Sequence, residues 1–109
     1  IIEIPTLFEK DFGAFVAYNP GTVNSLVFHD YVVIPDPFGP KINGVDMFKK
    51  DLEDRVGTAA NALGKDGTGM KIYFTDDWDW YHRLLGEVHC GTNQEGPPQP
   101  DVQWWGAMR

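Results

Sequence analysis

The chain is poor in cysteine and has no long apolar run. Its single cysteine cannot form an internal disulfide, which is compatible with a reducing compartment. No apolar stretch approaches the roughly 20 residues that a membrane-spanning helix needs. The amino end has no secretory signal pattern. We therefore expect a cytoplasmic protein that has no membrane partner.

Basic residues are also scarce. Nine Lys and Arg residues stand against 16 Asp and Glu residues, and the formal net charge is −7. Because the chain has no basic stripe, nucleic acids and anionic membrane surfaces are poor partners for it. A cationic ligand suits this balance of charge.

Apolar and aromatic residues, by contrast, are plentiful. They make up 42% and 14% of the 109 residues, which is enough for a core and too much for a disordered segment. A chain of this length is one domain at most. It starts at Ile1 without a Met, in a stretch typical of a domain interior. We expect residues 1–109 to be incomplete as a domain.

Hydrophobic patterning predicts four strands and one helix. The strands are expected at residues 14–18, 22–28, 31–34 and 70–75, and the second of them to be covered on both faces. The helix is expected over residues 43–63, with Asn43 as its N-cap and Gly64 as its C-cap. His29 is expected in a surface turn. From residue 22 to residue 75 the order is strand, strand, helix, strand, a ββαβ unit of the α/β class.

The predicted helix carries one apolar stripe, with charged residues on its other face. Apolar residues recur at three- and four-residue steps; they are Val45, Phe48, Leu52, Val56, Ala60 and Leu63. The expected outer face contains Lys49, Lys50 and Glu53, with ion pairs between Lys50 and Asp54 and between Asp51 and Arg55.

Two groups of potential metal ligands follow the last strand. The segment Asp76-Asp77-Trp78-Asp79-Trp80 lacks the spacing of a calcium loop. Its acids are expected at the start of a helix over residues 81–85, and its tryptophans in packing. His82, His89 and Cys90 are three candidate zinc ligands where a structural site needs four. We expect no metal site in either group.

The only cysteine, Cys90, lies in the stretch Gly-Glu-Val-His-Cys-Gly-Thr-Asn at residues 86–93. Glycine permits backbone conformations that are closed to other residues, and it lets a ligand approach closely. A thiol between two glycines is therefore a candidate nucleophile. The alternative is a small buried hydrophobic residue, the usual role of a lone cysteine.

This stretch resembles the C-terminal end of the protein-arginine deiminases, enzymes that hydrolyse peptidyl-arginine to peptidyl-citrulline and ammonia. Further stretches resemble the same family in the same order and cover nearly the whole chain. They are Ile-Pro-Thr-Leu-Phe at residues 4–8, Pro-Gly-Thr-Val-Asn at 20–24, Ile-Pro-Asp-Pro-Phe-Gly-Pro at 34–40, Ile-Asn-Gly at 42–44, Tyr81-His82 and Trp104-Trp105.

The resemblance implies a fold and a role for this chain. The fold is a pentein, a five-bladed α/β propeller of ββαβ modules around a central active site. Residues 1–109 would be the C-terminal portion of such a catalytic domain. The partners implied are an arginine-containing protein or peptide and the remainder of the domain or a partner chain.

By the same resemblance, Cys90 matches the family's nucleophile. The proton-transfer His, the guanidinium-binding Asp residues and the calcium ligands of the family match no position in this chain. His89 is a poor substitute for that His, because adjacent side chains in an extended segment point to opposite sides. No spacing ties His82 to Cys90. Two other functions stay open: a catalytically incomplete interaction module, and a deiminase of small guanidino compounds.

Overall fold

The structure, a computed structural model, describes residues 2–57 and 69–93. In chain order its elements are β1 (Phe8–Asp11), β2 (Ala14–Ala17), β3 (Leu26–Val27), β4 (Tyr31–Pro35), β5 (Lys41–Ile42), β6 (Val45–Asp46), the helix α1 (Met47–Val56), β7 (Lys71–Thr75) and the 3-10 helix η2 (His82–Leu84). The expectations for Ala60, Leu63, Gly64, Trp104 and Trp105 lie outside the described residues.

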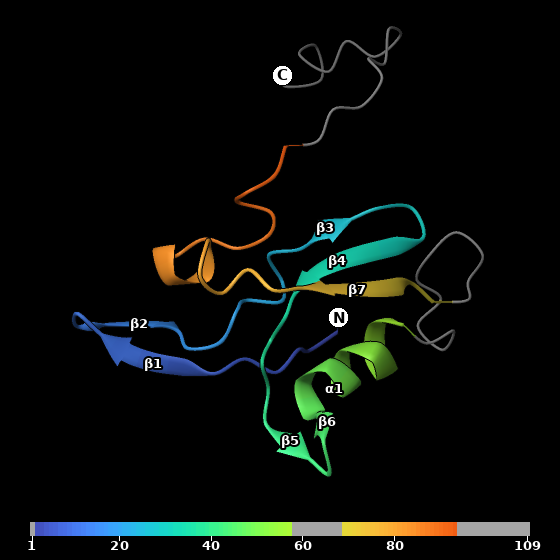
Figure 1. Ribbon diagram of the computed structural model, residues 1–109, viewed down its shortest axis with the longest axis horizontal. Helices are drawn as coiled ribbons and strands as arrows, with labels where there is room; N and C mark the ends of the chain where they lie inside the picture. The colour runs from blue at the N-terminus through green and yellow to red at the C-terminus, as the bar shows by residue number, and fades with distance from the viewer. Residues whose placement is uncertain (1, 58–68, 94–109) are drawn as a thin grey trace, which may run out of the picture.

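The central sheet has the strand order β3-β4-β7. β3 and β4 are antiparallel, and β4 and β7 are parallel with Ile34 opposite Phe74. A parallel pair requires a long crossover connection. Here that connection contains α1, which lies beside the sheet in Figure 1. The expected α/β class is confirmed, and the strand, strand, helix, strand order holds for the central sheet, with the unpredicted β5–β6 hairpin between β4 and the helix.

The core lies between α1 and the sheet. Its buried members are Val32 and Ile34 of β4 and Leu52 of α1, and Leu52 is only 1% exposed. Partly buried side chains pack around them, namely Ile4, Val56, Met70, Ile72 and Phe74. The alternation of Ile72 and Phe74 along β7 turns both toward the helix, as the sequence pattern predicted.

The helix is shorter than its apolar stripe predicted. It begins at Met47, and its N-cap is Asp46, whose carboxylate accepts hydrogen bonds from the backbone N–H groups of Phe48 and Lys49. It ends at Val56 with Gly57 as the C-cap. The predicted cap at Asn43 is therefore wrong. Asn43 and Gly44 have φ angles of 50° and 82° and form the tight turn between β5 and β6. Asn-Gly is the preferred pair for such a turn.

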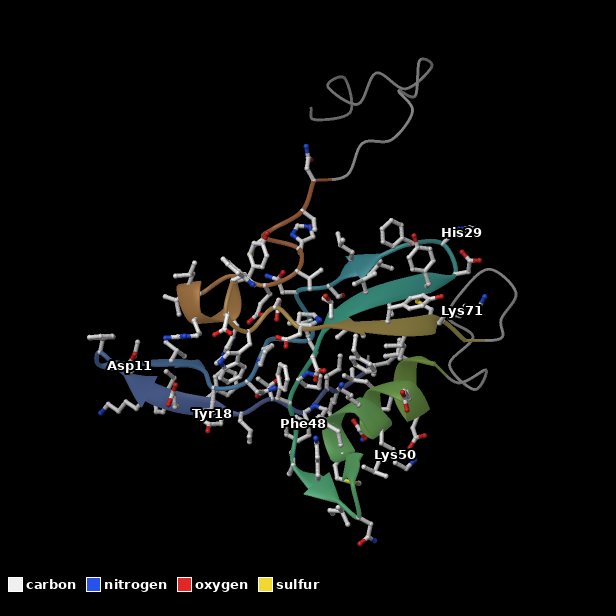
Figure 2. The ribbon with its side chains drawn as sticks, viewed as in Figure 1. Asp11, Tyr18, His29, Phe48, Lys50 and Lys71 are labelled. Atoms are coloured by element: carbon white, nitrogen blue, oxygen red, sulfur yellow. The ribbon has the colours of Figure 1, made fainter. Side chains whose placement is uncertain are left out.

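The predicted faces of the helix hold with two exceptions. Leu52 is buried, Val56 packs against the core, and both expected ion pairs on the outer face form. Val45 is 48% exposed, because it lies in β6 rather than in the helix. Lys49 was expected in solvent, but it forms an ion pair with Asp36 and lies over the Phe74 ring. Figure 2 shows Lys50 on the outer side of α1.

The predicted strand over residues 22–28 is largely wrong. Only Leu26 and Val27 form β3, and Val27 is 62% exposed. Residues 21–24 instead form a turn closed by a hydrogen bond from Asn24 N–H to the Gly21 carbonyl. In the described part of the chain β3 pairs with β4 alone, so its other edge stays open. His29 lies in the exposed turn before β4, as expected (Figure 2).

A hairpin of β1 and β2 projects from the sheet (Figure 1). β2 confirms the strand predicted at residues 14–18. The hairpin is largely exposed, and Phe8, Phe12 and Phe15 are exposed by 66%, 101% and 78%. Within residues 2–57 and 69–93, no helix has the length and apolar character that a membrane crossing requires.

We expect Leu52→Ala to lower the free energy of unfolding by about 2–5 kcal/mol, because the substitution leaves a cavity between α1 and β4. Urea titration followed by circular dichroism measures this. The matched control is Glu53→Ala, the exposed next residue on the helix, which should change stability by less than about 0.5 kcal/mol. Equal effects of the two substitutions would mean that Leu52 does not form the core.

Candidate functional site

Three segments meet at one end of the central sheet, and the first of them is far from the other two in the sequence. They are residues 18–24 before β3, residues 76–82 after β7, and residues 86–92. Because β4 and β7 are parallel and β3 is antiparallel to them, all three lie at the carboxyl ends of β4 and β7. The orange segment of Figure 1 lies at this end of the strands. In open α/β sheets this is the end at which ligands usually bind.

Cys90 is exposed in this arrangement and is not a core residue. The side-chain amide of Asn24 donates a hydrogen bond to Cys90 Sγ at 3.2 Å. The Asn24 side-chain oxygen accepts the backbone N–H of His89 at 2.9 Å. One asparagine therefore holds both the thiol and the residue before it. The exposure leaves the sulfur accessible to a reactant and removes the buried-hydrophobe alternative for Cys90.

Three hydrogen bonds lower the pKa of the Cys90 thiol below its ordinary value. The largest effect comes from a backbone hydrogen bond at Glu87, the next from the Asn24 amide, and a smaller one from the backbone of Cys90 itself. Partial burial and the negative charge of Glu87 act in the opposite direction. Since the thiolate is the nucleophilic form of cysteine, a lowered pKa suits a reactive thiol.

The backbone around Cys90 is a compact turn. Gly91 N–H donates to the carbonyl oxygens of Glu87 and Val88 at 3.1 and 3.2 Å, and the Thr92 hydroxyl donates to the His89 carbonyl at 3.1 Å. Tyr81 packs so closely on this turn that a Cβ at position 91 would collide with its ring. A side chain at position 91 would therefore require the Tyr81 ring to move.

His82 and Glu87 form the buried base of the site. The two side chains are 10% and 11% exposed, and His82 Nδ1 lies 2.8 Å from Glu87 Oε1. Gly21 N–H donates to the same oxygen at 3.0 Å. Sequence spacing did not tie His82 to Cys90, but the structure does so through Glu87, which opens the Cys90 turn. The imidazole also contacts the Trp78 ring, with centroids 4.8 Å apart.

Asp77 lies beside this pair and is 4% exposed. Burial, reinforced by a hydrogen bond and the negative charge of Glu87, raises the pKa of Asp77 to about 6. Neither of its carboxyl oxygens has a hydrogen-bond donor among the described residues. A proton on Asp77 satisfies the carboxyl pair, because two adjacent carboxylates in a buried site cannot both ionise easily.

The predicted helix over residues 81–85 is wrong. One 3-10 turn, η2, replaces it, without a side-chain cap, and Asp77 is buried in the protein rather than placed at a helix end. Trp78 packs against Phe38 and His82, as expected, whereas Trp80 is 78% exposed. In the described part of the chain, no three His, Cys, Asp or Glu residues are grouped to hold a metal ion.

A pocket of about 480 Å³ lies between the sheet and the Cys90 turn. Leu26, Val33 and Val88 supply apolar walls, while Asp77 and Tyr81 supply polar groups. Gly91 and Thr92 border this pocket, whereas Cys90 is not among its lining residues.

Comparison with known proteins identifies the family of this chain. A family model described as "Protein-arginine deiminase (PAD)" matches residues 1–106. The chain belongs to the protein-arginine deiminase family. The expected membership is therefore confirmed.

Three relatives illustrate the match. The chain is 39% identical to mouse protein-arginine deiminase type-1 over 108 residues, 43% identical to the rat type-3 protein over 105, and 42% identical to the human type-4 protein over 106. These alignments cover 99%, 96% and 96% of the chain but only 15%, 14% and 14% of the relatives. The chain therefore spans about 15% of the length of the curated deiminases that it matches.

The raised pKa of Asp77 predicts a pH-dependent stability. The folded state keeps the proton to about pH 6, whereas the unfolded chain loses it near the ordinary value of 3.8. The contribution of Asp77 to stability therefore falls as the pH rises from about 4 to 7. Asp77→Asn keeps a donor toward Glu87, so it should be more stable than the parent at pH 7 by roughly 1–3 kcal/mol, with no such gain at pH 4.

Urea titrations at pH 4, 5, 6 and 7 measure this difference. Asp79→Asn is the matched control, because Asp79 is exposed and pairs only with the exposed Arg83 among the described residues. A gain for Asp77→Asn that is the same at every pH would contradict the shared proton.

Proposed function

We propose that this chain supplies the nucleophile Cys90 to a hydrolase that converts peptidyl-arginine to peptidyl-citrulline and ammonia. The observation that carries the proposal is an exposed thiol whose sulfur accepts the Asn24 amide, in a chain of the deiminase family. An exposed cysteine with a lowered pKa is typical of a reactive thiol rather than of a packing residue.

The reaction needs a strong nucleophile because the guanidinium carbon is a poor electrophile. The Cys90 thiolate attacks this carbon and forms a C–S bond. A proton passes to one terminal nitrogen, and the bond between this nitrogen and the carbon breaks. Ammonia is released, and a covalent thiouronium remains on Cys90. Water then attacks the same carbon, the C–S bond breaks, and citrulline and the thiolate are released. Both steps require a group that moves protons.

We infer that the remaining catalytic groups come from outside residues 1–109. Among the described residues, the Cys90 sulfur accepts a hydrogen bond from the Asn24 side-chain amide, while His82 is engaged by Glu87 and by the Tyr18 carbonyl. On this proposal the chain is the C-terminal portion of a pentein catalytic domain. The remainder of that domain, or a partner chain, provides the proton-transfer His, the guanidinium-binding carboxylates and any calcium ligands. We propose the cytoplasm as its location.

A second candidate function is an interaction module without catalysis. The large exposed apolar side chains favour it, since a surface of this kind marks a site of association. They include Phe8, Phe12, Phe15, Leu84 and Leu85. A deiminase of small guanidino compounds is a third candidate. Comparing turnover of an arginine peptide with turnover of free arginine separates it from the first.

We expect Cys90→Ser to abolish citrulline formation while leaving the fold intact, because Cys90 is exposed and its hydrogen bond from Asn24 can be made to a hydroxyl. The measurement uses the intact protein that contains this chain, with an arginine peptide and with free arginine. An arginine-mimetic haloacetamidine should label Cys90, as read by mass spectrometry. Loss of activity with Cys90 unlabelled would assign the nucleophile to another residue.

The isolated 109-residue chain should form no citrulline, because groups that act together in catalysis lose orders of magnitude when members are missing. The comparison is the chain alone against a mixture with the remainder of its catalytic domain. Activity only in the mixture supports the proposal. Turnover by the chain alone would require a base and carboxylates among His82, His89, Asp76, Asp77 and Asp79.

A further inference from the structure

We propose that Glu87 and His82 form a positioning pair that holds the Cys90 turn against Asn24. Glu87 would act on the reaction only through the thiol, and neither side chain would touch substrate. The inference adds positioning residues to the proposed role of Cys90 and rests on that role only for its effect on turnover.

Glu87 is placed to act in this way because it joins the two sides of the site. Its Oε1 atom accepts hydrogen bonds from Gly21 N–H and from the His82 ring. Asn24 follows three residues after Gly21, in the turn that the Asn24 N–H closes onto the Gly21 carbonyl. Its side chain binds both the Cys90 sulfur and the His89 N–H. The carboxylate thus fixes residues 21–24 relative to residues 87–90.

His82 fixes the carboxylate in turn. Its Nδ1 faces Glu87 Oε1 at 2.8 Å, and its Nε2 faces the Tyr18 carbonyl oxygen at 3.2 Å. Carbonyl and carboxylate oxygens are acceptors, so both contacts are satisfied when the ring donates from both nitrogens, as the imidazolium does. The ring therefore ties the 18–21 segment to the same carboxylate from a second direction.

The charges around the pair are consistent with this arrangement. Asp77 faces Glu87 from the segment after β7 and carries the shared proton, so it adds no charge while protonated. Trp78 covers the imidazole with an uncharged ring, and the nearby Arg83 is paired with Asp79 away from the site.

The direction in which the Cys90 thiol pKa changes when Glu87 is replaced shows whether Glu87 positions the turn or acts only as a nearby charge. The negative charge of Glu87 by itself raises the pKa of the Cys90 thiol, whereas the backbone bond at Glu87 and the Asn24 amide lower it. If Glu87 were only a nearby charge, its removal would lower the thiol pKa. If Glu87 holds the turn, its removal frees Cys90 from both hydrogen bonds and raises the thiol pKa.

The experiment measures the rate at which iodoacetamide alkylates Cys90 in the intact protein between pH 6 and 10, by mass spectrometry of the Cys90 peptide. Glu87→Ala should raise the apparent pKa by about half a unit or more, and so reduce the thiolate at neutral pH by about threefold. Glu87→Gln keeps an oxygen acceptor for Gly21 and His82 but removes the negative charge, so its thiol pKa should lie at or below the parent value. Glu53→Ala, on the exposed face of α1, is the matched control.

An unchanged or lowered thiol pKa in Glu87→Ala would overturn the proposal. If Glu87→Ala does not fold, as judged by circular dichroism, His82→Phe makes the same test because it removes both ring nitrogens and keeps a ring of similar size. A raised pKa is again the expected result, and an unchanged one overturns the proposal. Since alkylation needs no turnover, a Cys90→Ser variant that stays active would refute the nucleophile proposal alone.

Discussion

A carboxylate that is withdrawn from water must replace its hydration with protein donors, and Glu87 finds those donors in segments remote from its own. Gly21 lies 66 positions away along the chain, and His82 brings in the Tyr18 carbonyl from the same region. Because these hydrogen bonds form only when the segments are adjacent, they specify how residues 18–24 meet the turn that carries Cys90. The position of the exposed Cys90 thiol therefore depends on the buried Glu87–His82 pair.

The sheet provides the frame for that base. β4 and β7 run parallel because α1 carries the chain back across the sheet, and Leu52 locks the helix onto Val32 and Ile34. Both strands consequently release the chain at the same end, where residues 76–93 and the turn before β3 come together. In α/β proteins the packed core commonly supports a site formed by loops at the carboxyl ends of the strands.

Several large apolar side chains are exposed on the described surface. Phe12 and Phe15 on the β1–β2 hairpin and Leu84 and Leu85 near η2 are largely exposed, and β3 leaves an open edge. Apolar patches and open edges of this kind are normally covered by another part of a protein. They accord with a chain that spans about 15% of the length of its relatives.

Local patterns in the sequence determined the elements whose causes are local. The alternation of Ile72 and Phe74, the β-branched run before Pro35 and the stripe through Leu52 and Val56 predicted β7, β4 and the buried face of α1. The motif around Cys90 also indicated the family. The Asn-Gly signal for a hairpin was present at residues 43–44, but the helical period that follows concealed it.

Only the tertiary structure decided the chemistry beneath Cys90. Gly21 and Glu87 are 66 positions apart, and so are Asn24 and Cys90. No spacing rule links residues across such a separation. Asp77 had the sequence signature of a solvated helix start, yet it is buried beside Glu87 and His82, two residues after the end of β7. Burial, and with it the altered pKa, depends on which segments fold against each other. A one-dimensional pattern does not contain that information.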